Sequence, residues 1–258
     1  MSRWRSESLR IVLRPTETLL LRAGRVGGNT FPRQSIAPLD DGQGREALAE
    51  SLTSPGWRAG RLDVVISNAL VRYVVTEPPG AFLSRSEERA LATARLAAIY
   101  GETARDWRLV TQSQPPDAGV FAAAIPAALF DAVRAAAAKA GIRRLRLRPL
   151  LDVAGARAKG PFANGWWVLA EPGWWCLLEA HRGAWRQIVS EPCVPEWPEH
   201  LALRLERAVL AAGRAPSPMP VRVQAVGTPL PDRIDHPAGW TGERVEPKGG
   251  GAWHWEAL

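Results

Sequence analysis

Cysteine, histidine and lysine are scarce in this chain of 258 residues. Only two cysteines are present, Cys176 and Cys193, and they form no CxxC pair, which argues against a disulfide framework and for a reducing compartment. The four histidines lie far apart in the sequence, without a partner at metal-ligand spacing, so we expect no metal site.

Long apolar runs are lacking as well. No window approaches the roughly 18 consecutive apolar residues that predict a transmembrane helix, and the first residues lead into no signal-peptide core. The sequence also lacks the G-x-S-x-G, G-x-x-x-x-G-K-S/T and G-x-G-x-x-G motifs of α/β-hydrolases, P-loop NTPases and dinucleotide-binding enzymes. These absences predict a soluble, cytoplasmic protein that would reach a membrane only through a partner.

Apolar residues and arginine are what the chain has in abundance. Hydrophobic residues make up 46% of the sequence, enough for a packed core. Only three of the 33 basic residues are lysines, and the formal net charge is +7. Such a charge suits nucleic acid, acidic lipid headgroups or an acidic protein, although the arginine content can also reflect the base composition of the gene.

The stretch 61–79 is predicted to be a central hairpin. Two β-branched runs, 62–66 and 70–75, flank Ser67 and Asn68, whose side chains suit a chain reversal. The elements expected before it are strands 9–13 and 18–22, a turn at 14–17 between them, a loop over 29–44 and a helix over 46–52.

Helices and strands alternate after this hairpin. Ser84 or Ser86 can cap a helix, and Glu87 and Glu88 in its first turn oppose the helix dipole. Pro126 suits the start of a second helix. The elements expected here are a helix ending at Gly101, strands 107–111 and 120–125, a helix over 127–140 and a strand over 142–149.

The strand expected over 142–149 alternates leucine with arginine. Leu145 and Leu147 face one way, whereas Arg144, Arg146 and Arg148 face the other. A nucleic-acid-binding ladder over 143–148 is one interpretation. A sheet margin with one hydrated face is the commoner reason for such a pattern, and we favour it.

Tryptophans mark the second half of the chain. We predict a three-stranded meander over 166–170, 174–180 and 184–189, a helix over 195–213, a last strand over 221–226 and a loose tail from 229. Each adjacent pair on a strand must place one ring on each face of the sheet. An uncovered ring of each pair, with one more beside it, would form an aromatic patch that binds a partner. The alternative is that the helix over 195–213 covers this face. The candidate residues are Trp166, Trp167, Trp174, Trp175 and Trp185.

The order of these elements resembles a known family. The segment from Glu87 to Trp107, the run Ala122–Pro126 with its helix, and Ala140-Gly141-Ile142 are similar to the PilM/GspL branch of actin-like proteins, including MshI-like proteins, which serve type IV pilus and type II secretion assembly. Residues 150–158 resemble the start of the family's linking helix, and the stretch 62–79 also resembles small proteins of this group.

The resemblance implies an α/β, ribonuclease-H-type fold that is duplicated into two lobes. We expect a first lobe over residues 1–160, with a small subdomain inserted around 61–148. A second lobe would cover 161–228, and 229–258 would form the loose Pro/Gly/Trp-rich tail.

Actin-like ATPases hold nucleotide phosphates at turns that usually contain Asp-x-Gly, where the carboxylate binds Mg²⁺ and the glycine admits phosphate. The resemblance places these turns at 14–17, 171–173 and 226–228. The first has neither the aspartate nor the glycine, the second has glutamate for aspartate, and the third keeps one glycine. The residues left at cofactor-binding positions are Glu171, Gly173, Gly227 and Thr228. ATP and Mg²⁺ binding is therefore expected to be weak or absent.

By this resemblance the chain is a non-enzymatic scaffold, peripheral to the inner membrane on its cytoplasmic side. It would bind the cytoplasmic segment of a PilN-like protein and copies of itself. The alternatives are a divergent ATPase, a nuclease that would use Asp63, Glu171 and Glu179 with metal ions, and a nucleic-acid-binding module that would use strand 143–148. We expect nucleic acid not to be the partner.

Overall fold

The computed structural model describes residues 8–22, 33–40, 42–57, 59–157, 162–215, 217–230, 232–247 and 253–255. The chain divides into two compact units. The first comprises Met1–Val71, Asp106–Arg108 and Ile125–Val153, and the second comprises Arg72–Arg105, Leu109–Ala124 and Ala154–Leu258. These divisions differ from the ones expected at residues 160 and 228, because most of the inserted segment groups with the second half of the chain.

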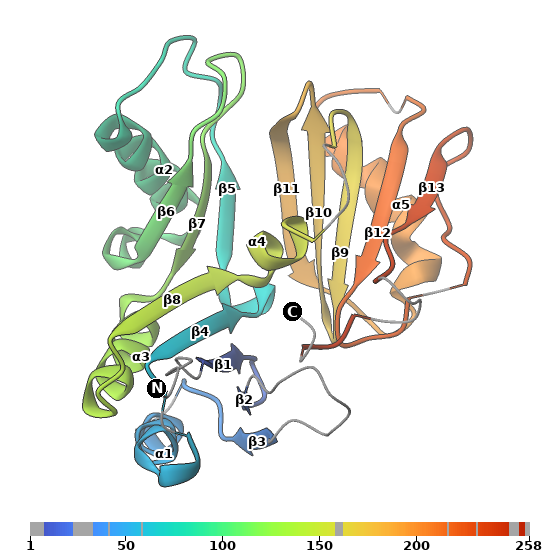
Figure 1. The fold of residues 1–258 in the computed structure, drawn as a ribbon. Helices are drawn as coiled ribbons and strands as arrows, with labels where there is room; N and C mark the ends of the chain where they lie inside the picture. The colour runs from blue at the N-terminus through green and yellow to red at the C-terminus, as the bar shows by residue number, and fades with distance from the viewer. Residues whose placement is uncertain are drawn as a thin grey trace, which may run out of the picture. The chain divides into compact units, whose positions relative to one another are not determined.

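A five-stranded mixed sheet forms the first unit, in the order β3-β2-β1-β4-β8 (Figure 1). Its strands are β1 (Ser8–Leu13), β2 (Thr18–Arg22), β3 (Arg33–Ile36), β4 (Arg61–Ile66) and β8 (Arg144–Pro149). The first three pair antiparallel, whereas β1, β4 and β8 run parallel. Their buried residues are almost all leucine, isoleucine and valine.

Two helices of the first unit contact each other, α1 (Gly42–Thr53) and α3 (Ala127–Lys139). Helix α1 lies on the face of the sheet to which Gln34 points, since the Gln34 amide donates to the Ser51 hydroxyl at 3.0 Å. Pro126 precedes α3 as predicted, and the predicted stop at Gly141 has a φ of +69°, which favours glycine.

The predicted central hairpin over 61–79 is wrong. Strand β4 lies between β1 and β8, whereas β5 (Arg72–Val75) pairs antiparallel with β7 (Phe121–Ile125) in another sheet. Ser67 and Asn68 build a cap instead of a reversal. The Ser67 hydroxyl accepts from the backbone N–H of Ala69 in the short helix η2 (Asn68–Leu70). The buried Asn68 amide oxygen accepts from the backbone N–H of Leu151 at 3.2 Å.

The predicted loop over 29–44 is also partly wrong. Residues 33–36 form strand β3, which pairs with β2, and α1 begins at Gly42. Residues 29–32 and 41 lie outside the described residues. Proline and glycine around this short strand masked its pairing, which depends on a neighbour and not on its own sequence. The short helix η1 (Pro55–Trp57) then leads towards β4.

The second unit contains most of a small sheet in the order β5-β7-β6, with β6 at Arg108–Gln112. Helix α2 (Arg85–Tyr100) begins at a capping box. The Ser84 hydroxyl accepts from the Glu87 N–H, and the Glu87 carboxylate accepts from the Ser84 N–H at 2.7 Å. Hydrogen bonding from the Ser84 side chain, and next from its backbone N–H, lowers the pKa of Glu87. The helix ends at Gly101, as predicted, and η3 (Glu102–Asp106) follows.

A second five-stranded sheet makes up the rest of this unit, in the order β11-β10-β9-β12-β13 (Figure 1). Its strands are β9 (Gly165–Glu171), β10 (Trp174–His181), β11 (Ala184–Pro192), β12 (Pro220–Ala225) and β13 (Thr241–Arg244), and helix α5 (Trp197–Ala211) lies between β11 and β12 in the sequence. The strand directions repeat those of the first sheet, because β9, β10 and β11 pair antiparallel while β9, β12 and β13 run parallel. Duplication within one chain is therefore visible in the topology.

The described parts of residues 229–258 do not form a loose tail. Strand β13 pairs with β12, and the side chains of Trp240, Trp253 and Trp255 are buried. This segment supplies the fifth strand of the second sheet, in the position that β8 has in the first. The expected linking helix begins as α4 (Leu150–Gly155). Among the described residues, no helix combines the length and apolar character needed to cross a bilayer.

Candidate functional site

The turn between β9 and β10 is the second of the three predicted phosphate turns. Glu171 ends β9 and is 3% exposed, and Gly173 has a φ of +75°, so a left-handed glycine closes the turn after Pro172. The Gly173 carbonyl accepts from the Cys193 backbone N–H at 3.0 Å. A glutamate this deeply buried leaves Pro172 and Gly173 as the exposed part of the turn, and proline has no N–H for a phosphate.

The turn at 226–228 is occupied by the chain's own C-terminal residues. The Gly227 N–H donates to the Trp253 carbonyl at 2.7 Å, and Val226 forms a parallel bridge with Trp253. Gly227 has a φ of +68°, and a Cβ there would lie 2.3 Å from the Trp255 indole nitrogen. Trp253 therefore occupies the backbone donor that a phosphate would use at this glycine, and Trp255 occupies the space beside it. Thr228 is half-buried beside it.

The turn at 14–17, in the first unit, is closed by an internal ion pair. Arg14 and Glu17 form a salt bridge of 2.5 Å, and the Ser35 hydroxyl donates to the same carboxylate at 2.5 Å. The backbone N–H of Arg14 donates to the Glu17 carbonyl. The one acidic side chain of this turn is thus bound to β3 and to its own turn.

The three carboxylates of the nuclease alternative are not brought together. Glu179, which is 2% exposed, binds Arg214 through both carboxylate oxygens, and Asp63 of the first unit pairs with Arg61 at 3.0 Å. Glu171 and Glu179 lie in paired strands, but their registers differ by five residues, which is about 17 Å along a strand. In the described part of the chain, no group of three His, Cys, Asp or Glu side chains could hold a metal.

Both thiols are held in the protonated form. Burial, and next the charge of Glu171, raise the pKa of the half-buried Cys193 to about 11. Burial raises the pKa of Cys176 as well, although its hydrogen bond with the Ser190 hydroxyl acts in the opposite direction. A cysteine nucleophile needs the thiolate, so neither residue is suited to covalent catalysis.

Most of the tryptophans predicted to form an exposed patch lie in the core. Trp166, Trp167 and Trp175 are 0%, 5% and 4% exposed, whereas Trp174 and Trp185 are half-buried. Trp166 and Trp175 pack against helix α5 in one apolar cluster with Trp197, whose ring meets that of Trp175 edge-on at 6.1 Å. Helix α5 therefore covers this face of the sheet, as the alternative interpretation of the tryptophan pairs predicted.

The other face of this sheet carries the remaining rings. Trp167 stacks on Trp185 with ring centroids 6.1 Å apart, and Trp174 donates its indole N–H to the Ser190 hydroxyl at 2.9 Å. Gln114 binds both backbone groups of Trp185, because its side-chain amide oxygen accepts from the Trp185 N–H and its amide nitrogen donates to the Trp185 carbonyl. A partner-binding role for Trp174 and Trp185 stays a prediction, on much less surface than expected.

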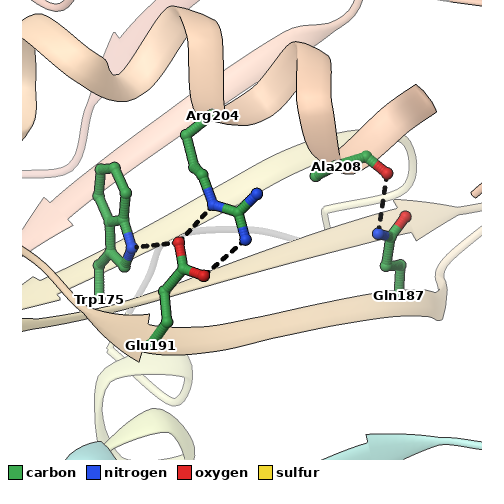
Figure 2. Close-up of polar contacts among 5 residues, drawn as sticks. All are labelled: Trp175, Gln187, Glu191, Arg204 and Ala208. Carbon is green, nitrogen blue, oxygen red and sulfur yellow. Dashed lines mark hydrogen bonds and ion pairs between the residues drawn. The ribbon is translucent and has the colours of Figure 1, made fainter. Parts of the chain in front are cut away.

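A polar cluster fixes helix α5 on the sheet (Figure 2). The Glu191 carboxylate accepts from the Trp175 indole N–H at 3.1 Å and binds the Arg204 guanidinium with both oxygens. The Gln187 amide donates to the Ala208 carbonyl at 3.0 Å. The hydrogen bonds between Arg204 and Glu191 raise the pKa of Arg204. Sequence reasoning missed the cluster, although Glu191 and Arg204, each beside an apolar run, were the available signal.

No family model matches the sequence, and no curated protein matches it. Several solved structures are similar. The cytoplasmic domain of EpsL, an inner-membrane component of the type II secretion system of Vibrio cholerae, is 19% identical, with a TM-score of 0.59 over 95% of this chain and 90% of that one. A chain of the PilM–PilN type IV pilus biogenesis complex is 14% identical, with a TM-score of 0.57 over 98% and 90%.

A third similar structure comes from Bacteroides thetaiotaomicron, a protein of unknown function with an actin-like ATPase fold. It is 10% identical, with a TM-score of 0.54 over 90% of this chain and 87% of that one. The chain therefore has the actin-like fold, as the sequence resemblance predicted. Two of these three structures also come from the secretion and pilus systems that the resemblance named.

Proposed function

We propose that this chain is a non-enzymatic, cytoplasmic scaffold of a type IV pilus or type II secretion platform at the inner membrane. The proposal rests on one combination. The fold is that of the EpsL cytoplasmic domain and of a chain of the PilM–PilN complex, while the turns that hold phosphate in actin-like ATPases carry altered residues engaged in internal contacts. A fold kept without its nucleotide chemistry is best explained by protein contacts.

The state of the three turns supports the absence of ATP-driven switching. Glu17 and Gly227 are engaged by Arg14 and by Trp253, and Glu171 is buried. At the turn 226–228, phosphate binding would have to displace Trp253 from the Gly227 N–H. At each of the other two turns it would bring negative charge to a glutamate, Glu171 at one turn and Glu17 at the other. We therefore propose that neither ATP nor Mg²⁺ is a resident cofactor.

The partner we propose is the cytoplasmic segment of a PilN-like inner-membrane protein, with further copies of this chain as a second contact. The binding experiment uses the full chain and a synthetic peptide that carries this segment from the PilN-like protein of the same organism. Calorimetry should give saturable binding of one peptide per chain, and a peptide of scrambled order should not bind.

The same calorimeter tests the enzymatic alternative. Addition of Mg²⁺-ATP at millimolar concentration should give no binding heat, and the protein should show no ATP hydrolysis above the buffer rate. ATP binding in the micromolar range, with no binding of the peptide, would replace the scaffold with a divergent ATPase. Absence of both would leave the proposed partner wrong.

A further inference from the structure

Arginines gather at one end of one face of the first unit's sheet. Arg10 of β1, Asp63 of β4 and Arg146 of β8 lie side by side in the strand register, and Arg61 and Arg144 form the next row. Residues that pair directly across neighbouring strands point to the same face. Through Leu21 of β2, the register also aligns Arg33 of β3 with Arg10. We call this surface the arginine face: Arg10, Arg33, Arg61, Arg144, Arg146 and Arg148.

This face is the one that helix α1 does not cover. Gln34 and Arg22 point to the opposite face, where Gln34 contacts Ser51 of α1 and Arg22 donates to the Gly56 carbonyl. In the register, Gln34 aligns with Leu20, Ile11, Val64 and Leu147. Leu147 therefore lies on the helix side of the sheet, and the arginines lie on the other.

In the rows of strand residues that form the arginine face, the described residues include one carboxylate, Asp63, which is already paired with Arg61 at 3.0 Å. Arg148 is 3.9 Å from Asp152 of α4. Arg144 and Arg146 are exposed, and neither has an ion pair in the described part of the chain. Arg144 and Arg146 of strand β8 thus carry positive charge that no described acidic side chain of this unit neutralises.

The outer side of β8 is an edge of the sheet, since β8 ends the strand order and pairs with β4 alone among the described strands. An edge strand offers backbone N–H and C=O groups to a further strand. A second copy of β8 is a poor candidate, because side-by-side pairing would bring arginines against arginines, which is destabilising. Leu145 and Leu147, on the helix side of the same strand, are only half-buried.

We propose that the free edge of β8 and the arginine face bind an extended acidic segment of a partner protein, which adds a sixth strand to this sheet. Glutamates or aspartates at alternate positions, about 6.6 Å apart along a strand, would meet Arg144, Arg146 and Arg148. The apolar residues between them would cover Leu145 and Leu147. The segment is thus defined by alternating acidic and apolar residues.

Two other anionic partners fit less well. Single-stranded nucleic acid is bound by aromatic side chains that stack on bases, and the described residues of the arginine face include no aromatic one. An anionic membrane would use the arginines but leave Leu145 and Leu147 uncovered. The inference concerns the first unit alone and does not depend on the proposed function.

The test uses the full chain and a fluorescent ten-residue peptide that alternates glutamate with valine. The comparison peptide has the same composition with all five glutamates contiguous. A third peptide alternates glutamate with valine but carries an N-methyl group on every backbone amide, which removes the N–H donors of both edges and so blocks strand pairing. Anisotropy should show the alternating peptide binding at least tenfold tighter than either comparison peptide.

Two double variants locate the site. Arg144→Glu/Arg146→Glu should weaken binding of the alternating peptide at least tenfold. The control Arg134→Glu/Lys139→Glu, on helix α3, makes the same change in net charge and should stay within twofold of the unchanged protein. If circular dichroism shows the first variant to be unfolded, Arg144→Gln/Arg146→Gln replaces it, with an expected loss of at least threefold.

Several results would overturn the inference. If the contiguous or the N-methylated peptide bound as tightly as the alternating peptide, binding would be due to non-specific charge attraction alone. Equal losses of affinity in the two double variants would lead to the same conclusion. Tighter binding of a twenty-nucleotide oligo-dT, or of phosphatidylglycerol vesicles, with the same dependence on Arg144 and Arg146, would assign the face to nucleic acid or to lipid. Absence of peptide binding would end the proposal.

Discussion

The two five-stranded sheets have the same strand topology but differ in the residues that form their cores. In each, three antiparallel strands are followed by two that run parallel to the first, with a helix between the third and fourth strands. The first sheet is packed with leucine, isoleucine and valine and has a second helix, α3, before its fifth strand. The second sheet has a core in which Trp166, Trp175 and Trp240 pack with helix α5, including Trp197 at the start of that helix.

The difference shows how one topology can be completed by different means. The described residues between β12 and β13 contain no helix, and Trp240 joins the core cluster there together with Leu230 and Ile234. A tryptophan buries roughly 150–250 Å² of surface, so a few rings can replace much of the apolar face of a helix. The two sheets thus have the same strand order although their cores consist of different residue types.

Removing one ring should break the second sheet more than a comparable change breaks the first. Trp166→Ala should lower the free energy of unfolding by about 3–5 kcal/mol, because a fully buried indole leaves a large cavity. Ile11→Ala, on the central strand of the first sheet, should cost about 2–4 kcal/mol. Urea unfolding followed by circular dichroism measures both. A loss below about 1 kcal/mol for Trp166→Ala would mean that the aromatic core is not what stabilises the unit.

The ion pairs of the two sheets should differ in the same direction. Arg214→Ala leaves the Glu179 carboxylate, 2% exposed, without its bidentate partner and should cost about 3 kcal/mol. Arg61→Ala, which removes the more exposed partner of Asp63, should cost less than about 1 kcal/mol. Glu179→Leu/Arg214→Met should recover part of the loss. Equal losses for Arg214→Ala and Arg61→Ala in urea unfolding would contradict the comparison.

Two glycines of the second sheet separate backbone strain from packing. Gly173→Ala and Gly227→Ala both place an alanine at positive φ, at about 1 kcal/mol each, but only the second brings a Cβ against Trp255. Gly227→Ala should therefore cost about 1–2 kcal/mol more in thermal unfolding. The difference should shrink in a Trp255→Ala background. A difference that persists there would show that Trp255 does not fill this turn.

The smallest effect concerns the thiols, both of which lie in the second unit. Because burial raises the pKa of Cys193 to about 11, the folded protein keeps this proton when the unfolded chain has begun to lose it, near pH 9. The contribution of this group to stability is therefore fully present below about pH 9 and falls as pH rises towards 11. Alkylation of native Cys193 by iodoacetamide, followed by mass spectrometry, should stay slow at pH 8. Rapid labelling there would contradict the assignment.

Most elements could be predicted from the sequence because their signals are local. Ser84 with Glu87 marks a capping box, Pro126 and Gly141 bracket α3, and the tryptophan meander follows from its apolar runs and glycine turns. Pairing between distant strands is not local. Ser67 and Asn68 suit a turn and a cap equally well, so the sequence could not separate β4 from β5.

Strand β13 and the burial of the tryptophan rings in the second sheet could not be predicted from the sequence, for related reasons. The β13 residues Thr241 to Arg244 are all exposed and include a glycine, so neither alternation nor β-propensity marks them as a strand. Adjacent tryptophans do place their rings on opposite faces, but whether a face is exposed depends on where α5 packs. The altered residues of the phosphate turns could be recognised in the sequence. The occupation of the turn 226–228 by Trp253 and Trp255 could not.

The insertion between β4 and β8 has a consequence for how the chain folds. Arg61 pairs with Arg144, 83 positions later, whereas β9, β10 and β11 pair with immediate neighbours. Loop closure over such a separation is slow, so we expect the tryptophan meander to acquire amide protection first, with the parallel edge of the first sheet last. Pulse-labelled hydrogen exchange during refolding would show the order, and early protection of β8 would reverse it. During synthesis, β4 would wait for β8 while the whole intervening segment leaves the ribosome.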